Sequence, residues 1–91
     1  MEKKIEKKLR EAVKSKGGYA FKLIFGAVRG APDRVILMPG ARVFFAELKN
    51  GSAGRLRVGQ KAMAKILDRL GFKVWIISNE VELQEFLLQL N

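Results

Sequence analysis

The chain has 91 residues, 48% of them hydrophobic and 30% charged, which fits a single globular domain over residues 1–91. It has no cysteine and no histidine, which excludes disulfides, thiolate zinc sites, a cysteine nucleophile, His-based triads and His metal ligands. Any metal must therefore be held by oxygen ligands. Eighteen Lys and Arg against nine Asp and Glu give a net charge of +9, which favours nucleic acid as the partner.

An acidic membrane surface or an acidic protein is a weaker candidate partner for this charge. No apolar run reaches the roughly 18 residues that span a bilayer, and no signal-peptide core follows the N-terminus. We therefore expect no membrane association and a cytoplasmic location.

The first half of the chain predicts one helix and three strands. Helical spacing of four apolar residues predicts a helix over residues 2–16, which a Gly-Gly pair ends. Alternation predicts a strand over 19–25, with its aromatic residues on one face. Strands over 35–38 and 42–49 flank a Pro-Gly turn and form an antiparallel hairpin. The helical stripe is Ile5, Leu9, Ala12 and Val13, and the strand face is Tyr19, Phe21, Leu23 and Phe25.

The second half predicts a helix, a strand and a last helix after a basic glycine-rich loop. A helix over 58–70 and a strand over 73–77 place that strand parallel to 42–49 through a right-handed crossover. Asn79 begins the last helix. The residues expected to face inward are Ala62, Met63, Ile66, Leu67 and Leu70 in the first helix and Val81, Phe86, Leu87 and Leu90 in the last. The order αβββαβα predicts an α/β fold with a mixed sheet.

Two carboxylates have unexpected positions in the predicted hairpin. Asp33 opens one strand and Glu47 closes the other, so antiparallel pairing places them side by side at one end of the sheet. Two adjacent carboxylates repel each other unless a proton or a cation lies between them. Lys49, two residues after Glu47, points to the same face. A metal ion beside a lysine is suited to the hydrolysis of a phosphodiester.

Each residue also has a structural interpretation. Glu47 and Lys49 could form a surface ion pair where the strand emerges into solvent, and an Asp after Pro often only starts a turn. Glu11 could be a solvated residue paired with Lys7 or Lys14. A basic nucleic-acid-binding module without catalysis would fit the charge equally well, but it does not explain two clustered acidic residues.

The pattern Pro32-Asp33 followed by Glu47-Leu48-Lys49 resembles the PD-(D/E)XK nuclease superfamily. With the surrounding segments, the resemblance is to the VRR-NUC family, and it covers nearly the whole chain. These segments are Gly17-Gly18 before a strand with Lys22, Gly30 to Arg34, Phe45 to Lys49, and a Gly/Ser loop before Gln60. It is similar to the compact standalone members of bacteria and phages, which implies a restriction-endonuclease-like core and a bacterial or phage-infected host cell.

The resemblance implies a role for each matching residue. Asp33 and Glu47 would bind Mg²⁺, or Mn²⁺, with the Leu48 carbonyl oxygen as a further ligand. Lys49 would be the catalytic lysine. Glu11 matches the helical glutamate that supports the metal, and Gln60 would orient a ligand, a water or a phosphate. Lys22 would contact a phosphate, and the other basic residues expected to bind DNA are Arg29, Arg34, Arg55 and Arg57.

The same resemblance implies a structure-selective DNA endonuclease, with a role in DNA repair. It suggests branched DNA such as a four-way (Holliday) junction, cleaved by a homodimer. A symmetric dimer would double the basic surface and supply two cuts. The first and last helices are candidate interfaces, with Leu88 as the residue expected to meet a partner rather than the core.

Overall fold

The computed structural model describes residues 3–24, 30–49 and 56–91, and it confirms the predicted order of elements. Each element lies within three residues of its predicted bounds. The elements are α1 (Lys4–Ser15), β1 (Tyr19–Lys22), β2 (Arg34–Met38), β3 (Arg42–Leu48), α2 (Val58–Arg69), β4 (Val74–Ile77) and α3 (Glu80–Leu88).

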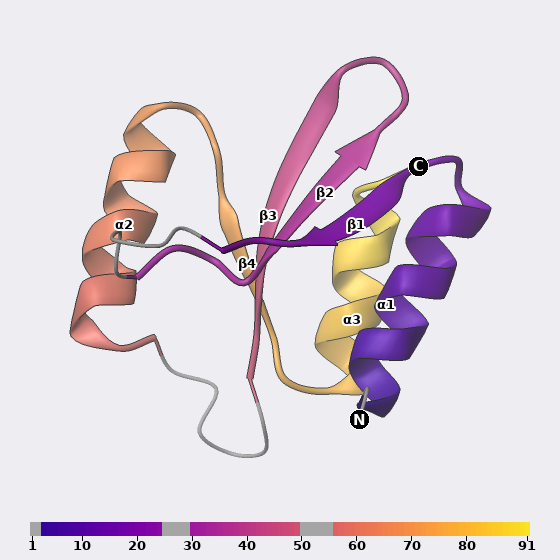
Figure 1. Cartoon of the computed structure of the whole chain (residues 1–91), viewed down its shortest axis with the longest axis horizontal. Coiled ribbons are helices and arrows are strands. Elements are labelled where there is room, and N and C mark those ends of the chain that lie inside the picture. The colour runs from indigo at the N-terminus through magenta and orange to yellow at the C-terminus, as the bar shows by residue number, and fades with distance from the viewer. Residues whose placement is uncertain (1–2, 25–29, 50–55) are drawn as a thin grey trace.

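The four strands form one sheet in the order β1-β2-β3-β4 (Figure 1). The β1–β2 and β2–β3 pairs are antiparallel, and β3 and β4 are parallel, as the sequence predicts. In the β2–β3 register, Arg34 lies opposite Ala46. The start of β2 and the end of β3 therefore meet at one end of the sheet.

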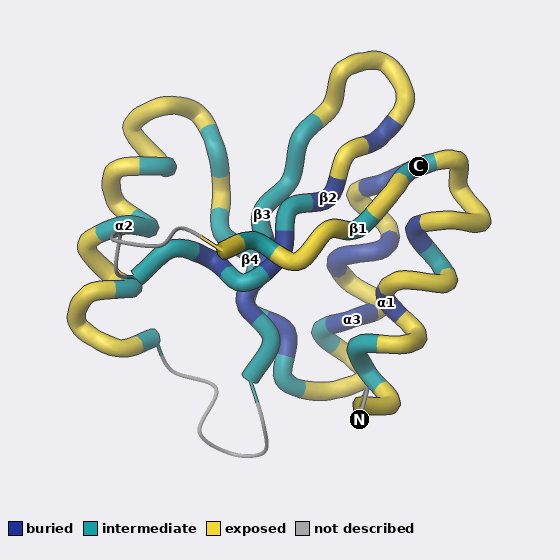
Figure 2. The backbone as a smooth tube through the Cα atoms, in the orientation of Figure 1, coloured by how far each residue is buried: buried dark blue, intermediate teal, exposed yellow. Residues whose placement is uncertain are grey.

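The core lies between the sheet and the pair α1 and α3, which stand side by side on one face (Figure 1). Alternate strand residues and the helical stripes supply it, so most buried residues gather on this side (Figure 2). Its buried members are Leu9, Val13, Ile36, Met38, Ala46, Ile77, Leu83, Phe86, Leu87 and Leu90. The rings of Phe44 and Trp75 pack edge-on against Phe86 at 5.9 and 5.6 Å.

The opposite face of the sheet is covered less completely. Helix α2 lies there, over the β4 edge, and none of its residues is buried (Figure 2). The predicted inward stripe of this helix is therefore wrong in part: Ala62, Ile66 and Leu70 are exposed, and only Met63 and Leu67 are half-buried. One helix on four strands cannot cover the whole face.

Two further expectations need correction. The first strand ends at Lys22 rather than 25; Leu23 and Ile24 lie outside it, and Phe25 lies outside the described residues. Val81 is exposed, and Leu83 is the residue that α3 buries near its start. No helix in the described part of the chain has the length and apolar character needed to cross a membrane.

Candidate functional site

The structure brings Asp33 and Glu47 together at the end of the sheet. The Asp33 backbone N–H donates to Glu47 Oε1 at 3.0 Å. The Leu48 N–H approaches both Asp33 carboxylate oxygens at 3.3 Å. These reciprocal contacts join the start of β2 to the end of β3, so the hairpin register fixes the two carboxylates relative to each other.

Two further contacts hold the backbone of Asp33. Its carbonyl oxygen accepts from the Leu23 N–H at 2.9 Å and from Arg34 Nη1 at 2.9 Å. The first contact continues the β1–β2 pairing beyond Lys22, and it places Leu23 opposite Asp33. The Asp33 side chain is 37% exposed, whereas Glu47 is buried. Asp33 is thus the carboxylate that a ligand can reach most directly.

Glu47 is the centre of a polar network with Lys49 and Gln60. Its Oε2 accepts from Lys49 Nζ at 3.0 Å and from Gln60 Nε2 at 2.5 Å. Gln60 Oε1 in turn accepts from Lys49 Nζ and from the Arg57 N–H, both at 2.9 Å. Because Glu47 is buried, these donors offset the cost of removing its charge from water. Gln60 orients Glu47 and Lys49 while also capping the start of α2.

Gly30 explains why the start of α2 can reach this network. A Cβ atom at position 30 would lie 2.3 Å from the Gly59 carbonyl oxygen and 2.9 Å from the Gln60 nitrogen. The φ angle of Gly30 is +83°, a conformation that side chains rarely adopt. Both the close approach and the backbone conformation require glycine. Gly30 therefore sets the position of Gln60 beside Glu47.

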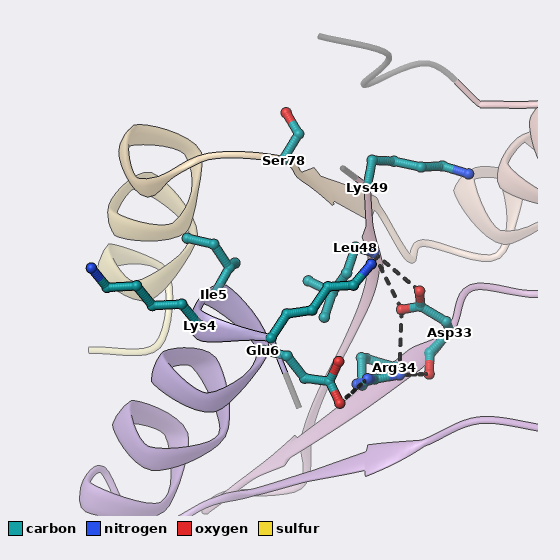
Figure 3. A pocket seen from close by; sticks show the side chains of 9 residues that line it. Lys4, Ile5, Glu6, Asp33, Arg34, Leu48, Lys49 and Ser78 are labelled. Atoms are coloured by element: carbon teal, nitrogen blue, oxygen red, sulfur yellow. Dashed lines mark hydrogen bonds and ion pairs between the residues drawn. The ribbon is translucent and has the colours of Figure 1, made fainter. Parts of the chain in front are cut away.

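The helix α1 contributes Glu6, which is not among the site residues predicted from the sequence. Its Oε1 lies 2.8 Å from Nη2 of Arg34, whose side chain is only 8% exposed. Figure 3 shows Glu6 and Asp33 both approaching the Arg34 guanidinium, which lies 3.7 Å from Asp33 Oδ1. Glu6 precedes the two buried residues of α1, Leu9 and Val13, by three and seven positions. This spacing places Glu6 beside the buried stripe, but it does not predict that its partner is Arg34.

Glu11 does not take the position that was expected of it. It is exposed, and it does not line the hollow that contains Asp33 and Glu6. Glu11 follows Glu6 by five positions, a rotation of about 140° around a helix with 3.6 residues per turn. The two side chains therefore leave α1 in different directions, and only Glu6 reaches the end of the sheet.

The electrostatic environment raises the pKa of Asp33 to about 6. Partial burial is the main cause, and repulsion from Glu47 adds to it. The hydrogen bond from Leu48 and the charges of Arg34 and Lys49 oppose the rise. A carboxylate with a raised pKa beside a second carboxylate is the environment in which a bound cation relieves repulsion.

A hollow of about 230 Å³ opens beside Asp33 (Figure 3). It lies between the start of α1, the end of β3 and the residue that follows β4. Its lining combines acidic and basic groups: Lys3, Lys4, Ile5, Glu6, Asp33, Arg34, Leu48, Lys49 and Ser78. A second hollow is lined by Gly30, Ala31, Arg57, Gly59 and Gln60, and Gln60 joins it to Lys49 of the first hollow.

The oxygen donors at this site fit a hard divalent cation. Mg²⁺ is usually bound by one or two carboxylates and keeps several waters, and Asp33 and Glu47 supply two carboxylates. No group of three or more acidic side chains suited to a metal occurs within residues 3–24, 30–49 and 56–91. Glu47 already accepts hydrogen bonds at both oxygens. The carbonyl oxygen of Leu48 and waters would have to complete the coordination.

The basic residues expected to bind DNA divide into three groups. Lys22 and Arg57 are exposed, and each borders a hollow near the site. Arg34 is buried in its ion pair with Glu6, so its guanidinium is not presented to a DNA phosphate. Arg29 and Arg55 lie outside the described residues.

Comparison with known proteins supports the fold. No protein-family model matches the chain. A solved structure described as "VRR_NUC domain" superposes with a TM-score of 0.87, covers 96% of this chain and 94% of its own, and is 20% identical. The chain therefore has the fold of a VRR_NUC domain, as its sequence resemblance implies.

One curated relative matches part of the chain. "Putative nuclease p44" of Acyrthosiphon pisum secondary endosymbiont phage 1 is 40% identical over 48 residues. The match covers 53% of this chain and 52% of that protein, so it spans about half the length of each.

Proposed function

We propose that this protein is a metal-dependent DNA endonuclease of the VRR-NUC family that hydrolyses phosphodiester bonds. The observation that carries the proposal is the adjacent pair Asp33 and Glu47 with Lys49 bonded to Glu47, on a chain of net charge +9. The VRR_NUC fold and the partial match to a phage nuclease support it. The charge would attract the DNA backbone, and the carboxylates would hold the ion that the chemistry needs.

Asp33, Glu47 and the Leu48 carbonyl would hold Mg²⁺ or Mn²⁺. When bound, such an ion polarises a phosphoryl oxygen and lowers the pKa of a coordinated water. Asp33 offers the exposed carboxylate, and its fixed backbone keeps that carboxylate at the mouth of the hollow. The buried Glu47 is held in one orientation by Gln60, and its oxygens, which already accept hydrogen bonds, would share those contacts with the ion.

Lys49 would be the group that stabilises negative charge on the reacting phosphate. Its ammonium lies 3.0 Å from Glu47 and 2.9 Å from Gln60, and it lines the hollow beside Asp33. Three donors on one ammonium allow it to keep the Gln60 contact and donate to a phosphate oxygen as well. Lys22 and Arg57 would bind flanking phosphates.

A panel of labelled DNA substrates tests this proposal. Single-stranded, duplex, flapped and four-way-junction DNA would be incubated with Mg²⁺, Mn²⁺ or EDTA, with wild-type protein and with Lys49→Ala. We expect metal-dependent cleavage, strongest on branched DNA, that EDTA abolishes and that Lys49→Ala reduces at least about hundredfold, the scale of removing one charge-stabilising donor. DNA binding without cleavage under every metal condition would instead indicate a non-catalytic binding module.

We also propose that the protein acts on branched DNA as a homodimer through α3. Val81 and Leu88 are exposed, lie seven residues apart and therefore share one side of this helix. We expect Leu88→Arg to shift the protein from dimer to monomer in sedimentation experiments at micromolar concentration. Its thermal stability should change little, since Leu88 is 67% exposed. A wild-type protein that is already a monomer under these conditions would contradict the dimer.

A further inference from the structure

Two aromatic side chains stand exposed on the face of the sheet that carries the two carboxylates. Tyr19 and Phe21 are 55% and 45% exposed, and their ring centroids lie 4.6 Å apart with 31° between the planes. Both belong to β1, at the edge of the sheet opposite to β4. Helix α2 packs against β4, at the other edge of the sheet (Figure 1).

The aromatic pair is aligned with the catalytic site along the strand. Leu23 lies opposite Asp33, and Phe21 and Tyr19 follow on the same face at intervals of two residues. At about 3.3 Å per residue, the two rings stand roughly 7 and 13 Å from the level of Asp33. A strand of DNA whose phosphate lies at Asp33 could thus place its neighbouring bases on these rings.

Basic side chains border the same edge. Lys14 and Arg10 line a hollow with Tyr19, and Lys22 lines a neighbouring hollow with Arg10 and Ala20. Exposed aromatic rings beside a positively charged track are the combination that binds unpaired nucleotides, since every base can stack and the backbone is an anion. A second copy of the chain would bring like charges to this edge, which favours nucleic acid as the occupant.

We propose that Tyr19 and Phe21 form a stacking platform for unpaired bases next to the cleaved bond, with Lys14 and Lys22 contacting the backbone. This inference rests on the proposed nuclease function and specifies its substrate: DNA with a single-stranded segment beside the cut. Branched substrates would be preferred because their bases can leave the duplex at the branch. In a continuous duplex every base is stacked between its neighbours, so none could stack on the two rings.

Binding measured in EDTA tests the platform separately from catalysis. Fluorescence anisotropy would compare a forked DNA with unpaired arms and a fully paired duplex of the same length. We expect the Tyr19→Leu, Phe21→Leu double variant to lose about tenfold to hundredfold in affinity for the fork, and little for the duplex, from the strength of base–aromatic stacking. Leucine keeps the apolar surface and removes the ring, and Tyr19→Phe should retain wild-type binding.

The salt dependence separates the rings from the lysines. The leucine variant should keep the wild-type slope of the logarithm of the DNA-binding constant against the logarithm of the salt concentration. The Lys14→Gln, Lys22→Gln double variant should reduce the magnitude of this slope by about 0.7 for each lost contact with a single-strand phosphate. Leu70→Ala, at the exposed apolar residue that follows α2, is the matched control and should bind as the wild type.

Three results would overturn the platform. The first is an unchanged affinity of the leucine double variant for the fork. The second is an equal loss of affinity of that variant for the fork and the duplex. The third is a change from dimer to monomer in the Tyr19→Ala, Phe21→Ala variant. The last result would assign the face to a second copy of the chain. If no metal supports cleavage but the fork affinity falls as expected, the nuclease proposal fails and the binding surface stands.

Discussion

Replacing Asp33 with asparagine is expected to abolish metal-dependent cleavage and, at neutral pH, to make the folded protein more stable. The carboxylate that would bind the metal is partly buried and lies beside Glu47, so the metal-free protein bears the cost of that charge. Asparagine keeps an oxygen that can accept from the Leu48 N–H. We expect activity to fall below detection and the free energy of unfolding to rise by about 1 kcal/mol, after allowing for solvent screening at this half-exposed group.

The pH dependence of this difference follows from the raised pKa. Folded protein binds a proton at Asp33 up to about pH 6, while the unfolded chain releases it near the ordinary value of 3.8. The contribution of this group to stability is therefore fully present below about pH 4 and is lost as pH rises through about 6. Asp33→Asn should exceed the wild type in stability above pH 6 and match it below pH 4, as measured by urea unfolding.

Glu47→Gln is the matched comparison for this experiment. It should also abolish cleavage, but it should destabilise the protein by roughly 1–3 kcal/mol, because the Lys49 ammonium loses its acidic partner in a largely buried network and keeps the neutral Gln60. Two inactive variants with stability changes of opposite sign would identify Asp33 as the strained carboxylate. Full magnesium-dependent activity in either variant would contradict the assigned site.

Glu6→Ala is expected to have a much larger effect than Glu11→Ala, although both remove a glutamate from α1. Among the described residues, loss of Glu6 leaves the buried Arg34 guanidinium with Asp33 as its remaining acidic partner. We expect a loss of about 2–3 kcal/mol in the free energy of unfolding, below the usual range for a buried pair because Glu6 is partly exposed. Cleavage should fall as well, since Arg34 can then turn toward Asp33 Oδ1.

Glu11→Ala is the control, with an expected change in stability within about 0.5 kcal/mol and nearly unchanged cleavage, because Glu11 is exposed. Thermal unfolding and initial cleavage rates of the two variants, measured together, distinguish them. A strong loss of cleavage in Glu11→Ala with normal activity in Glu6→Ala would restore the role that sequence resemblance assigned to Glu11.

The order of elements and the position of the carboxylate pair could be predicted from the sequence because both follow from local rules. A Pro-Gly turn fixes the hairpin register, and that register alone places Asp33 beside Glu47. The parallel pairing of β3 and β4 follows from the helical crossover between them. The resemblance to VRR-NUC is confirmed at the level of the fold.

The parts that could not be predicted depend on tertiary packing. The Glu6–Arg34 ion pair requires the docking angle of α1 on the sheet, which no spacing in the sequence encodes. Arg34 was expected to contact DNA. It is instead buried between Glu6 and Asp33, because the docking of α1 on the sheet brings Glu6 to its guanidinium. The apolar stripe predicted for α2 is largely exposed because this helix meets one edge of a wider sheet.

Direct measurement of metal binding tests the central claim, that Asp33 and Glu47 hold the ion used for hydrolysis. Mn²⁺ would be titrated into wild-type protein and into Asp33→Asn at pH 8, with free Mn²⁺ followed by electron paramagnetic resonance. We expect a saturable site in the wild type that Asp33→Asn loses, with cleavage rising as the site fills. Equal Mn²⁺ binding by both proteins would contradict this claim, as would cleavage that proceeds in EDTA.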